Sequence, residues 1–229
     1  MTSGKFLCAL IAALIVSLLI CTPVAAYSDD ATSLYAQGQA LIQTKDYARA
    51  EQAFDSAIAL EPNYFEAWNA KADALNRERN FAEALAASNK SLEINPDYAK
   101  GWINRGQILY NIGYEYEDVF KDMTTANALY ADQLQAFENA IAADPNNAEA
   151  WFNKGYALGG MKRYDEAIAA FNHVIQIDPS YPQIQANLKI AEGLRDKAAP
   201  SYKSYVVPVA AGAIVAVIAV AWFLVRKKK

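Results

Sequence analysis

Four carboxylates lie close together near the middle of the sequence, at Glu115, Glu117, Asp118 and Asp122. Paired carboxylates can act as a general acid and a general base, and clustered oxygen ligands can hold calcium. A calcium loop, however, needs alternating oxygen ligands around a central glycine, and this stretch contains no such loop. At these spacings the four acids would lie around a helix surface. We therefore interpret them as a solvated face.

The other reactive side chains do not combine into a catalytic or metal site. His173 is the only histidine, and both cysteines, Cys8 and Cys21, lie in the first segment. A structural zinc site and a Ser/His or Cys/His catalytic arrangement are therefore not expected. Gly159-Gly160 fits a turn between helices better than a phosphate-binding loop. We expect no enzymatic activity, no metal and no cofactor, and we interpret His173 as a surface or groove-edge residue.

The first 26 residues have the layout of a secretory signal peptide. A basic start at Lys5 precedes an apolar run that ends at Ile20, and small residues then lead to Ala26. We expect cleavage after Ala26. An uncleaved anchor and a lipoprotein attached through Cys21 are the alternatives.

The last part of the chain predicts a single membrane span. Residues 206–225 are uncharged and mostly apolar, and as a helix they would be about 30 Å long, enough to cross the hydrocarbon core. A short linker, 200–205, precedes them. The basic tail, 226–229, favours the cytoplasmic side. The expected location is therefore the plasma membrane or a secretory-pathway membrane, with the middle of the chain outside and the tail in the cytoplasm.

The segment that would face outward is acidic. Taking Lys5 and the four tail residues from the twenty-one Lys and Arg leaves sixteen, against twenty-five Asp and Glu. Phosphate binding needs the opposite sign, so a nucleic-acid partner is not expected.

Between the two ends, landmark residues recur at fixed spacing. Three prolines each lie six residues before a tryptophan, in the pairs Pro62 and Trp68, Pro96 and Trp102, and Pro145 and Trp151. Apolar residues also recur at helical steps, as in Trp151, Gly155 and Leu158. This spacing predicts pairs of amphipathic helices, and each pair must stack on its neighbours to bury its apolar face.

A 34-residue period with this layout of helix, turn and helix resembles the tetratricopeptide repeat family. The resemblance implies an all-α fold, a right-handed superhelical solenoid of four helix pairs with a capping helix. In this chain the third pair is lengthened, and the C-terminal transmembrane helix described above completes the expected fold. Leu34 replaces the family's first Trp, and Ser88 and Ser91 replace its Phe and Ala in the second repeat. We therefore expect the second repeat to be the least well packed. The expected domain spans 27–199, with repeats at 31–64, 65–98, 99–147 and 148–181 and the capping helix at 183–198.

The third repeat is longer than the others by fifteen residues, which fall roughly at 114–129. Apolar residues continue the helical stripe of the first helix through Tyr116 and Phe120, and a similar stripe runs backwards from the second helix. We therefore expect both helices to grow by about two turns and to meet near 121–125, with Thr124 or Thr125 as the N-cap. The free tip would present Tyr114, Tyr116, Phe120 and Met123, either as an apolar patch for a partner or only to hold the hairpin together.

The resemblance also implies a binding groove lined by the first helices, which receives a peptide or a partner's helix. Carried over by repeat position, the groove residues are Tyr35, Gln39, Asn69, Asp73, Asn76, Lys100, Ile103, Asn104, Gln107, Phe152, Asn153 and Tyr156. Asparagine amides can bond a peptide backbone through both the donor and the acceptor. The Lys and Asn arrangement that some family members use to hold a C-terminal carboxylate is not reproduced, because Tyr35 and Gln39 occupy its first two places.

We therefore expect a membrane-anchored extracytoplasmic scaffold that binds a protein or peptide through its groove and its lengthened hairpin. The alternative is a structural subunit of a cell-envelope or secretion assembly that oligomerises through its membrane helix and the insert. Gly212 and Ala216, four residues apart, could support such helix pairing.

Overall fold

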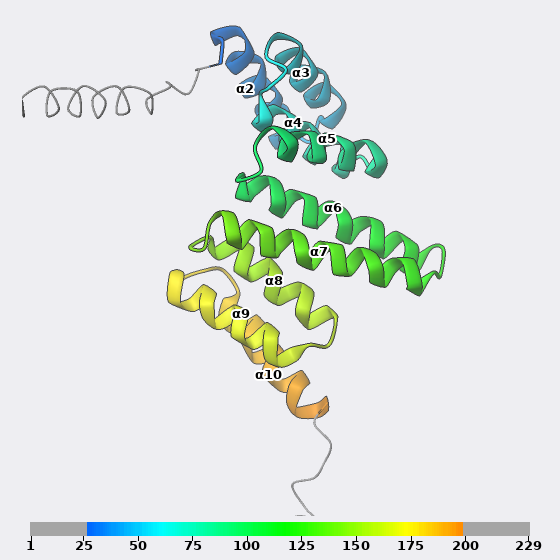
Figure 1. Cartoon of the computed structure of the whole chain (residues 1–229), viewed down its shortest axis with the longest axis vertical. Coiled ribbons are helices and arrows are strands. Elements are labelled where there is room, and N and C mark those ends of the chain that lie inside the picture. The colour runs from blue at the N-terminus through cyan, green and yellow to red at the C-terminus, as the bar shows by residue number, and fades with distance from the viewer. Residues whose placement is uncertain (1–26, 199–229) are drawn as a thin grey trace, which may run out of the picture. The chain divides into compact units, whose positions relative to one another are not determined.

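A computed structural model describes residues 27–198, a range that contains helices and turns but no strand (Figure 1). The all-α prediction is confirmed for this range. The helices form two compact units, one ending at Pro145 and the other beginning at Asn146. The predicted signal peptide, the linker, the transmembrane helix and the basic tail lie outside the described residues. Within 27–198, each helix is too short or too polar to span a bilayer.

The first unit consists of three helical hairpins. Each hairpin pairs two consecutive helices: α2 (Asp29–Gln43) with α3 (Tyr47–Leu60), α4 (Phe65–Arg77) with α5 (Phe81–Ile94), and α6 (Ala99–Asp118) with α7 (Met123–Ala143). The first helices also contact one another, because α4 touches both α2 and α6, whereas α3 and α5 do not meet. We call the surface formed by α2, α4 and α6 the inner face.

The second unit contains α8 (Ala148–Gly160), α9 (Tyr164–Ile177) and α10 (Ile184–Ala198). Helix α10 packs on α8 and α9 and buries Ile184 and Ala191. The turn predicted at Gly159-Gly160 is wrong. Both glycines belong to α8, and the chain turns afterwards around Lys162, which has φ 62°.

Hydrogen bonds explain the fixed distance from proline to tryptophan in the first unit. The indole Nε1 of Trp68 donates to the carbonyl oxygen of Pro62 at 2.9 Å, and Trp102 donates to Pro96 at 2.7 Å. Each bond joins the first helix of a hairpin to the start of the turn before it. The spacing therefore fixes how one hairpin follows the previous one.

Glycine and phenylalanine pair inside the hairpins. A Cβ atom added to Gly38 would lie 2.4 Å from the ring of Phe54, and one added to Gly106 would lie 2.5 Å from Phe137. Gly155 and Phe171 form the same pair in the second unit. The missing side chain lets the aromatic ring reach the backbone of the facing helix.

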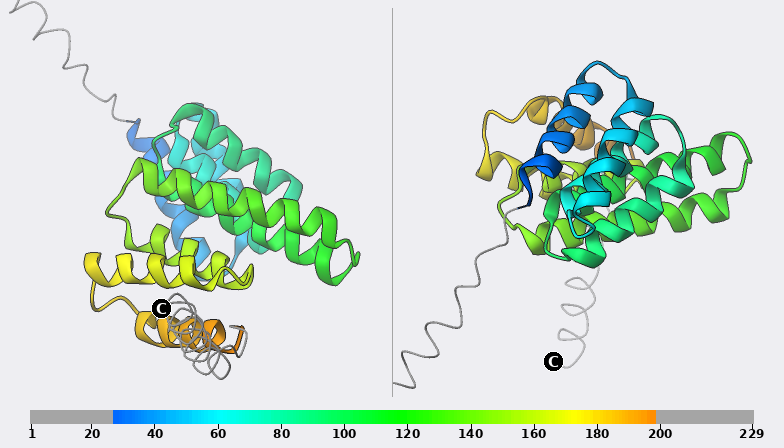
Figure 2. Two further views of the ribbon diagram at one scale, coloured as in Figure 1. Left: turned by 60° about the horizontal axis from the view of Figure 1, so that its bottom comes forward. Right: turned by 90° about the horizontal axis from the view of Figure 1, so that it is seen from above.

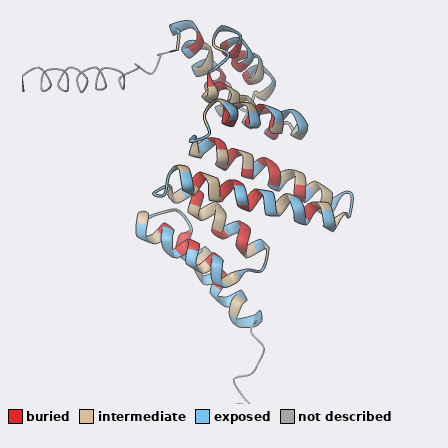
Figure 3. Cartoon of the chain, in the orientation of Figure 1, coloured by how far each residue is buried: buried red, intermediate tan, exposed pale blue. Residues whose placement is uncertain are grey.

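The second hairpin lacks this pair. Ser88 takes the place of the phenylalanine and is fully buried, and its hydroxyl has no hydrogen-bond partner within the described structure. Ser91, also buried, donates to the carbonyl oxygen of Phe65 at 2.8 Å. The unpaired hydroxyl of Ser88 agrees with the expectation that this repeat is the least well packed. Figure 3 shows the buried residues, in red, at intervals along the helices.

The third hairpin is longer than the others. Helices α6 and α7 have 20 and 21 residues, and together they extend past α4 and α5 (Figure 2). A second pair of glycine and aromatic residue, Gly113 with Tyr130, closes the extension at 2.7 Å, measured from a Cβ built on the glycine. The predicted N-cap at Thr124 or Thr125 is wrong. Asp122 caps α7, and its carboxylate accepts the backbone N–H groups of both threonines at 3.1 Å.

Candidate binding surfaces

The asparagines of the predicted groove bond to one another on the inner face. Asn69, Asn76 and Asn104 are buried. The Nδ2 of Asn104 donates to the backbone oxygen and to the Oδ1 of Asn69, and the Nδ2 of Asn111 donates to the Oδ1 of Asn76 at 2.9 Å. These amides join α4 to α6. Much of their bonding capacity is therefore used inside the protein.

The other predicted positions of the first unit differ in how accessible they are. Ile103 is buried in the core, and Asp73 forms an ion pair with Arg77 at 3.0 Å. Tyr35 is half-buried and accepts a hydrogen bond from Gln39 at 3.0 Å. The most accessible predicted positions on the inner face are Lys100 and Gln107 on α6, which are both exposed.

The predicted positions on α8 lie in the second unit. Phe152 is half-buried, and its ring lies 5.9 Å from that of Phe171 and 5.1 Å from that of Tyr181. Asn153 is half-buried, and Tyr156 is exposed. Tyr156 is therefore the most accessible predicted residue of this unit.

The sequence analysis missed a group of aromatic residues at the N-terminal end of the inner face. The ring of Tyr64 stacks on Tyr27 with 3.8 Å between centroids and lies 5.1 Å from Tyr35. Tyr98 meets Phe65 edge to face at 4.9 Å. We call Tyr27, Tyr35, Tyr64 and Tyr98 the tyrosine cluster. Its signal in the sequence is a tyrosine two residues after Pro62 and Pro96.

Glu66, in the first turn of α4, is an acidic residue that interacts electrostatically with all four tyrosines. The Tyr27 hydroxyl donates to its Oε2 at 3.1 Å. Burial, followed by the negative charge of Glu66, raises the pKa of Tyr27 to about 12. Burial is also the largest cause that raises the pKa of the other three tyrosines, and Glu66 contributes to each. The cluster is therefore a partly desolvated site with negative potential.

The hairpin tip carries exposed apolar side chains. Phe120 and Val119 are each 61% exposed, and Tyr114 and Met123 are about half exposed. Tyr116 is half-buried and lies 5.2 Å from the Phe120 ring. Of the four predicted tip residues, three are thus accessible and Tyr116 supports them. We call Tyr114, Val119, Phe120 and Met123 the tip patch.

The four acids of this region have separate partners. Glu115 pairs with Arg79 at 3.2 Å, Glu117 accepts the Tyr130 hydroxyl at 2.6 Å, and Asp118 pairs with Lys121 at 3.3 Å, while Asp122 caps α7. In the part of the chain that the structure describes, no three His, Cys, Asp or Glu residues are arranged to hold a metal ion. The acids therefore support the hairpin.

Two segments of the chain are similar to a known repeat sequence. Residues 35–99 and residues 148–181 each match a sequence model of the tetratricopeptide repeat. These two segments are similar to the tetratricopeptide repeat family. In the sequence, the matched segments lie on either side of the lengthened α6–α7 hairpin. No single curated protein matches the sequence.

Solved structures that contain tetratricopeptide repeats share this fold. The MamA protein is 20% identical, the match covers 74% of this chain and 86% of MamA, and the TM-score is 0.56. TTC0263 of Thermus thermophilus is 17% identical over 70% of this chain and 80% of its own, with a TM-score of 0.60. YrrB, described as having an unusual peptide-binding site, is 18% identical over 74% and 80%, with a TM-score of 0.53. At these identities the likeness concerns the fold.

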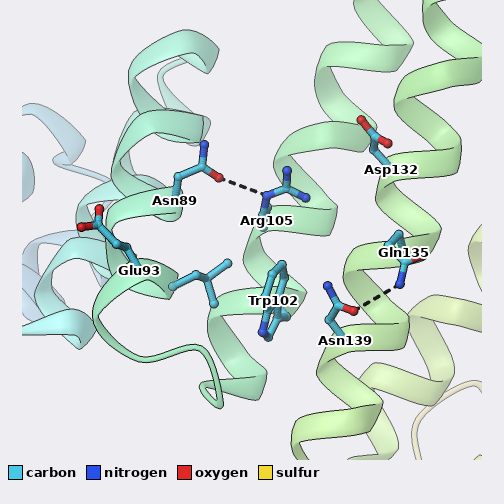
Figure 4. Close-up of a pocket in the computed structure, with 8 residues that line it drawn as sticks. Asn89, Glu93, Trp102, Arg105, Asp132, Gln135 and Asn139 are labelled. Atoms are coloured by element: carbon cyan, nitrogen blue, oxygen red, sulfur yellow. Dashed lines mark hydrogen bonds between the residues drawn. The ribbon is translucent and has the colours of Figure 1, made fainter.

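A polar cleft of about 480 Å³ lies between α5, α6 and α7 (Figure 4). Arg105 donates through Nε to the Oδ1 of Asn89 at 3.1 Å, and its guanidinium lies 5.9 Å from the Trp102 ring. Burial lowers the pKa of Arg105, and Asp132 opposes that shift. Glu93 and Asp132 also line the cleft, so its two acids outnumber its one basic residue.

Proposed function

We propose that the chain is a membrane-anchored scaffold that binds a protein partner outside the cytoplasm. Binding uses the inner face of the tetratricopeptide repeats and the tip patch. The observation that carries this proposal is the exposed apolar tip patch, which extends from a hairpin longer than its neighbours. Exposed apolar patches on soluble domains mark interaction sites.

The inner face supports the same proposal. It combines the exposed Lys100 and Gln107 with the partly buried aromatic surface of the tyrosine cluster. Aromatic residues are enriched in protein interfaces. A protein of similar fold, YrrB, is described as having a peptide-binding site, which agrees with this use of the fold.

The proposed membrane placement rests on the two terminal segments of the sequence. Tyr27 stacks on Tyr64, and the Ser28 N–H donates to Glu61 at 3.2 Å, so the residues that follow the proposed cleavage point are held by the domain. Removal of residues 1–26 would leave these contacts intact. N-terminal sequencing of the mature protein should begin at Tyr27.

The orientation can be tested by thiol labelling in intact cells. The variants Gln107→Cys and Lys229→Cys place single thiols in the domain and in the tail. A membrane-impermeant maleimide should label the first thiol and spare the second until the membrane is opened. Labelling of the tail without labelling of the domain would show that the orientation is the opposite of the one proposed.

The binding surfaces can be separated by photo-cross-linking. A photoreactive residue is placed at Gln107, at Phe120 or, as a control, at the exposed Gln52 on α3. A scaffold should cross-link a discrete protein from Gln107, from Phe120 or from both, but not from Gln52. Equal products from all three positions, or no product from any, would contradict the proposal.

A structural subunit that oligomerises through the insert is the second candidate, because the tip patch could also meet a second copy. The cross-linked product from Phe120 would then contain only this chain. Sedimentation of the full-length protein would show an oligomer that Phe120→Ser dissociates.

A further inference from the structure

We propose that Glu66 and the tyrosine cluster form a binding site for a positively charged side chain, a lysine or an arginine, of the partner protein. This inference rests on the proposed function and names the chemistry of the partner at the inner face. It assigns a role to Glu66, which holds the same repeat position as the predicted groove residue Lys100, and to the tyrosines around it.

Glu66 is a half-buried carboxylate without a cation. Its Oε2 accepts the Tyr27 hydroxyl, but among residues 27–198 no Lys, Arg or His lies within ion-pair distance, and no group donates to Oε1. Three other half-buried acids of this unit are paired with cations: Glu51 with Lys71 at 3.5 Å, Asp73 with Arg77 at 3.0 Å and Glu115 with Arg79 at 3.2 Å. Glu61 and Glu117, like Glu66, accept hydrogen bonds from uncharged donors. Glu66 therefore has an unused oxygen and an uncompensated charge.

The N-terminus of α4 offsets only part of this charge. Glu66 lies in the first turn, where the helix macrodipole contributes roughly half a unit of positive charge. The carboxylate therefore keeps a net negative potential. Glu61, which accepts the Ser28 N–H, and the two acids that open α2, Asp29 and Asp30, add negative charge at the same end of the unit.

The tyrosine cluster adds attraction for a cation. Ring faces carry a negative quadrupole, and a lysine or arginine placed over them is stabilised, more strongly where the site is desolvated. Tyr27 bonds to Glu66 at 3.1 Å and stacks on Tyr64, which lies 5.1 Å from Tyr35. The raised pKa values of the four tyrosines, which are due first to burial, agree with this arrangement. A cation that binds Glu66 therefore lies beside aromatic rings.

The fourth repeat reproduces part of the site, because burial and then the charge of Glu149 raise the pKa of Tyr181. The positions equivalent to Glu66 hold Thr32 in the first repeat, Lys100 in the third and Glu149 in the fourth. Lys100 is exposed and does not pair with Glu66. Glu149 has the same charge but is exposed, which makes it a matched control.

The probe is N-acetyl-lysine amide, titrated into the full-length chain with isotope-labelled tyrosine rings and followed by NMR. N-acetyl-arginine amide tests whether the site also binds an arginine side chain. N-acetyl-norleucine amide has a similar apolar chain without the charge. Both cationic probes should shift the resonances of Tyr27, Tyr35, Tyr64 and Tyr98, and norleucine should not. Equal shifts with norleucine, or no shift with either cation, would overturn the site.

The variant Glu66→Gln keeps the shape and removes the charge. It should weaken the response to the lysine probe by roughly five- to tenfold, whereas Glu149→Gln should leave it unchanged. Thermal unfolding checks that Glu66→Gln remains folded, and Tyr98→Leu is the second variant if it does not. An unchanged response in the folded Glu66→Gln variant would refute the inference.

The test of the cation site can fail independently of the test of the proposed function. If a cross-linked partner from Gln107 is retained at full strength by Glu66→Gln, the scaffold stands and the cation site falls. If the lysine probe binds through Glu66 but no partner cross-links, the cation site stands and the scaffold proposal falls.

Discussion

Asn104 on α6 donates its side-chain amide to two oxygens of Asn69 on α4, the backbone carbonyl and the Oδ1, both at 3.0 Å. Asn104 is 6% exposed. The pair therefore holds adjacent hairpins together. A loss of binding in an Asn104 variant would not by itself show that a partner contacts this residue.

Replacement of Asn104 by Ala should lower the free energy of unfolding by about 1–3 kcal/mol, because it leaves buried oxygens of Asn69 without a donor. The double variant Asn69→Ala with Asn104→Ala should cost less than the sum of the two single changes. Urea denaturation of the four proteins measures the coupling. If the two single changes in the free energy of unfolding add up to that of the double variant, the bond does not contribute to stability.

Gly106 faces the ring of Phe137, so Gly106→Ala should destabilise the protein. The new methyl group would lie 2.5 Å from the ring, and such overpacking costs about 1–3 kcal/mol. Gly159→Ala is the control, since no atom lies within 4 Å of its added Cβ. That variant should gain up to about 1 kcal/mol from helix propensity. Thermal unfolding midpoints should move in opposite directions.

Ser88→Ala should stabilise the protein by about 1 kcal/mol, because it removes a buried hydroxyl that lacks a partner within the described residues. Ser91→Ala, three residues further along α5, should have the opposite effect, since it removes the bond to the Phe65 carbonyl. Chemical denaturation distinguishes the two. A loss of stability in Ser88→Ala would mean that the hydroxyl is satisfied in solution.

The raised pKa of Tyr27 predicts a fall in stability at alkaline pH. Its folded-state pKa of about 12 lies above the ordinary tyrosine value of 10.0, so the neutral form is favoured by folding. Its contribution is fully present below pH 10 and is lost as the pH rises through about 12. Phenolate absorbance should show this late ionisation, and Glu66→Gln should move it to lower pH. Complete ionisation of all tyrosines near pH 10 in the folded protein would contradict the prediction.

The sequence predicts the hairpins well because their spacing reflects contacts within one repeat or with the preceding turn. The bond from Trp102 to Pro96 and the packing of Phe137 against Gly106 are examples. The length of the third hairpin follows from the same logic, since its apolar stripe continues without a break.

Side-chain direction at the inner face could not be derived from repeat position. Asn104 occupies a predicted groove position but points to Asn69 on the neighbouring helix, because the two amides satisfy each other. Glu66 was missed although it holds the same repeat position as Lys100, because its contact with Tyr27 is not visible in the sequence. Tyr27 was missed because it precedes the first repeat. Only the fold brings them together.

The two pairs of glycine and aromatic residue in the third hairpin are separated by the same number of residues on both helices. Gly113 follows Gly106 by seven residues, and Tyr130 precedes Phe137 by seven. Seven residues are about two helical turns, so the second pair meets on the same side as the first. A hairpin built in this way can change its length in evolution by gaining or losing seven residues on each helix. Additions of other lengths would rotate the tip patch away from its present direction.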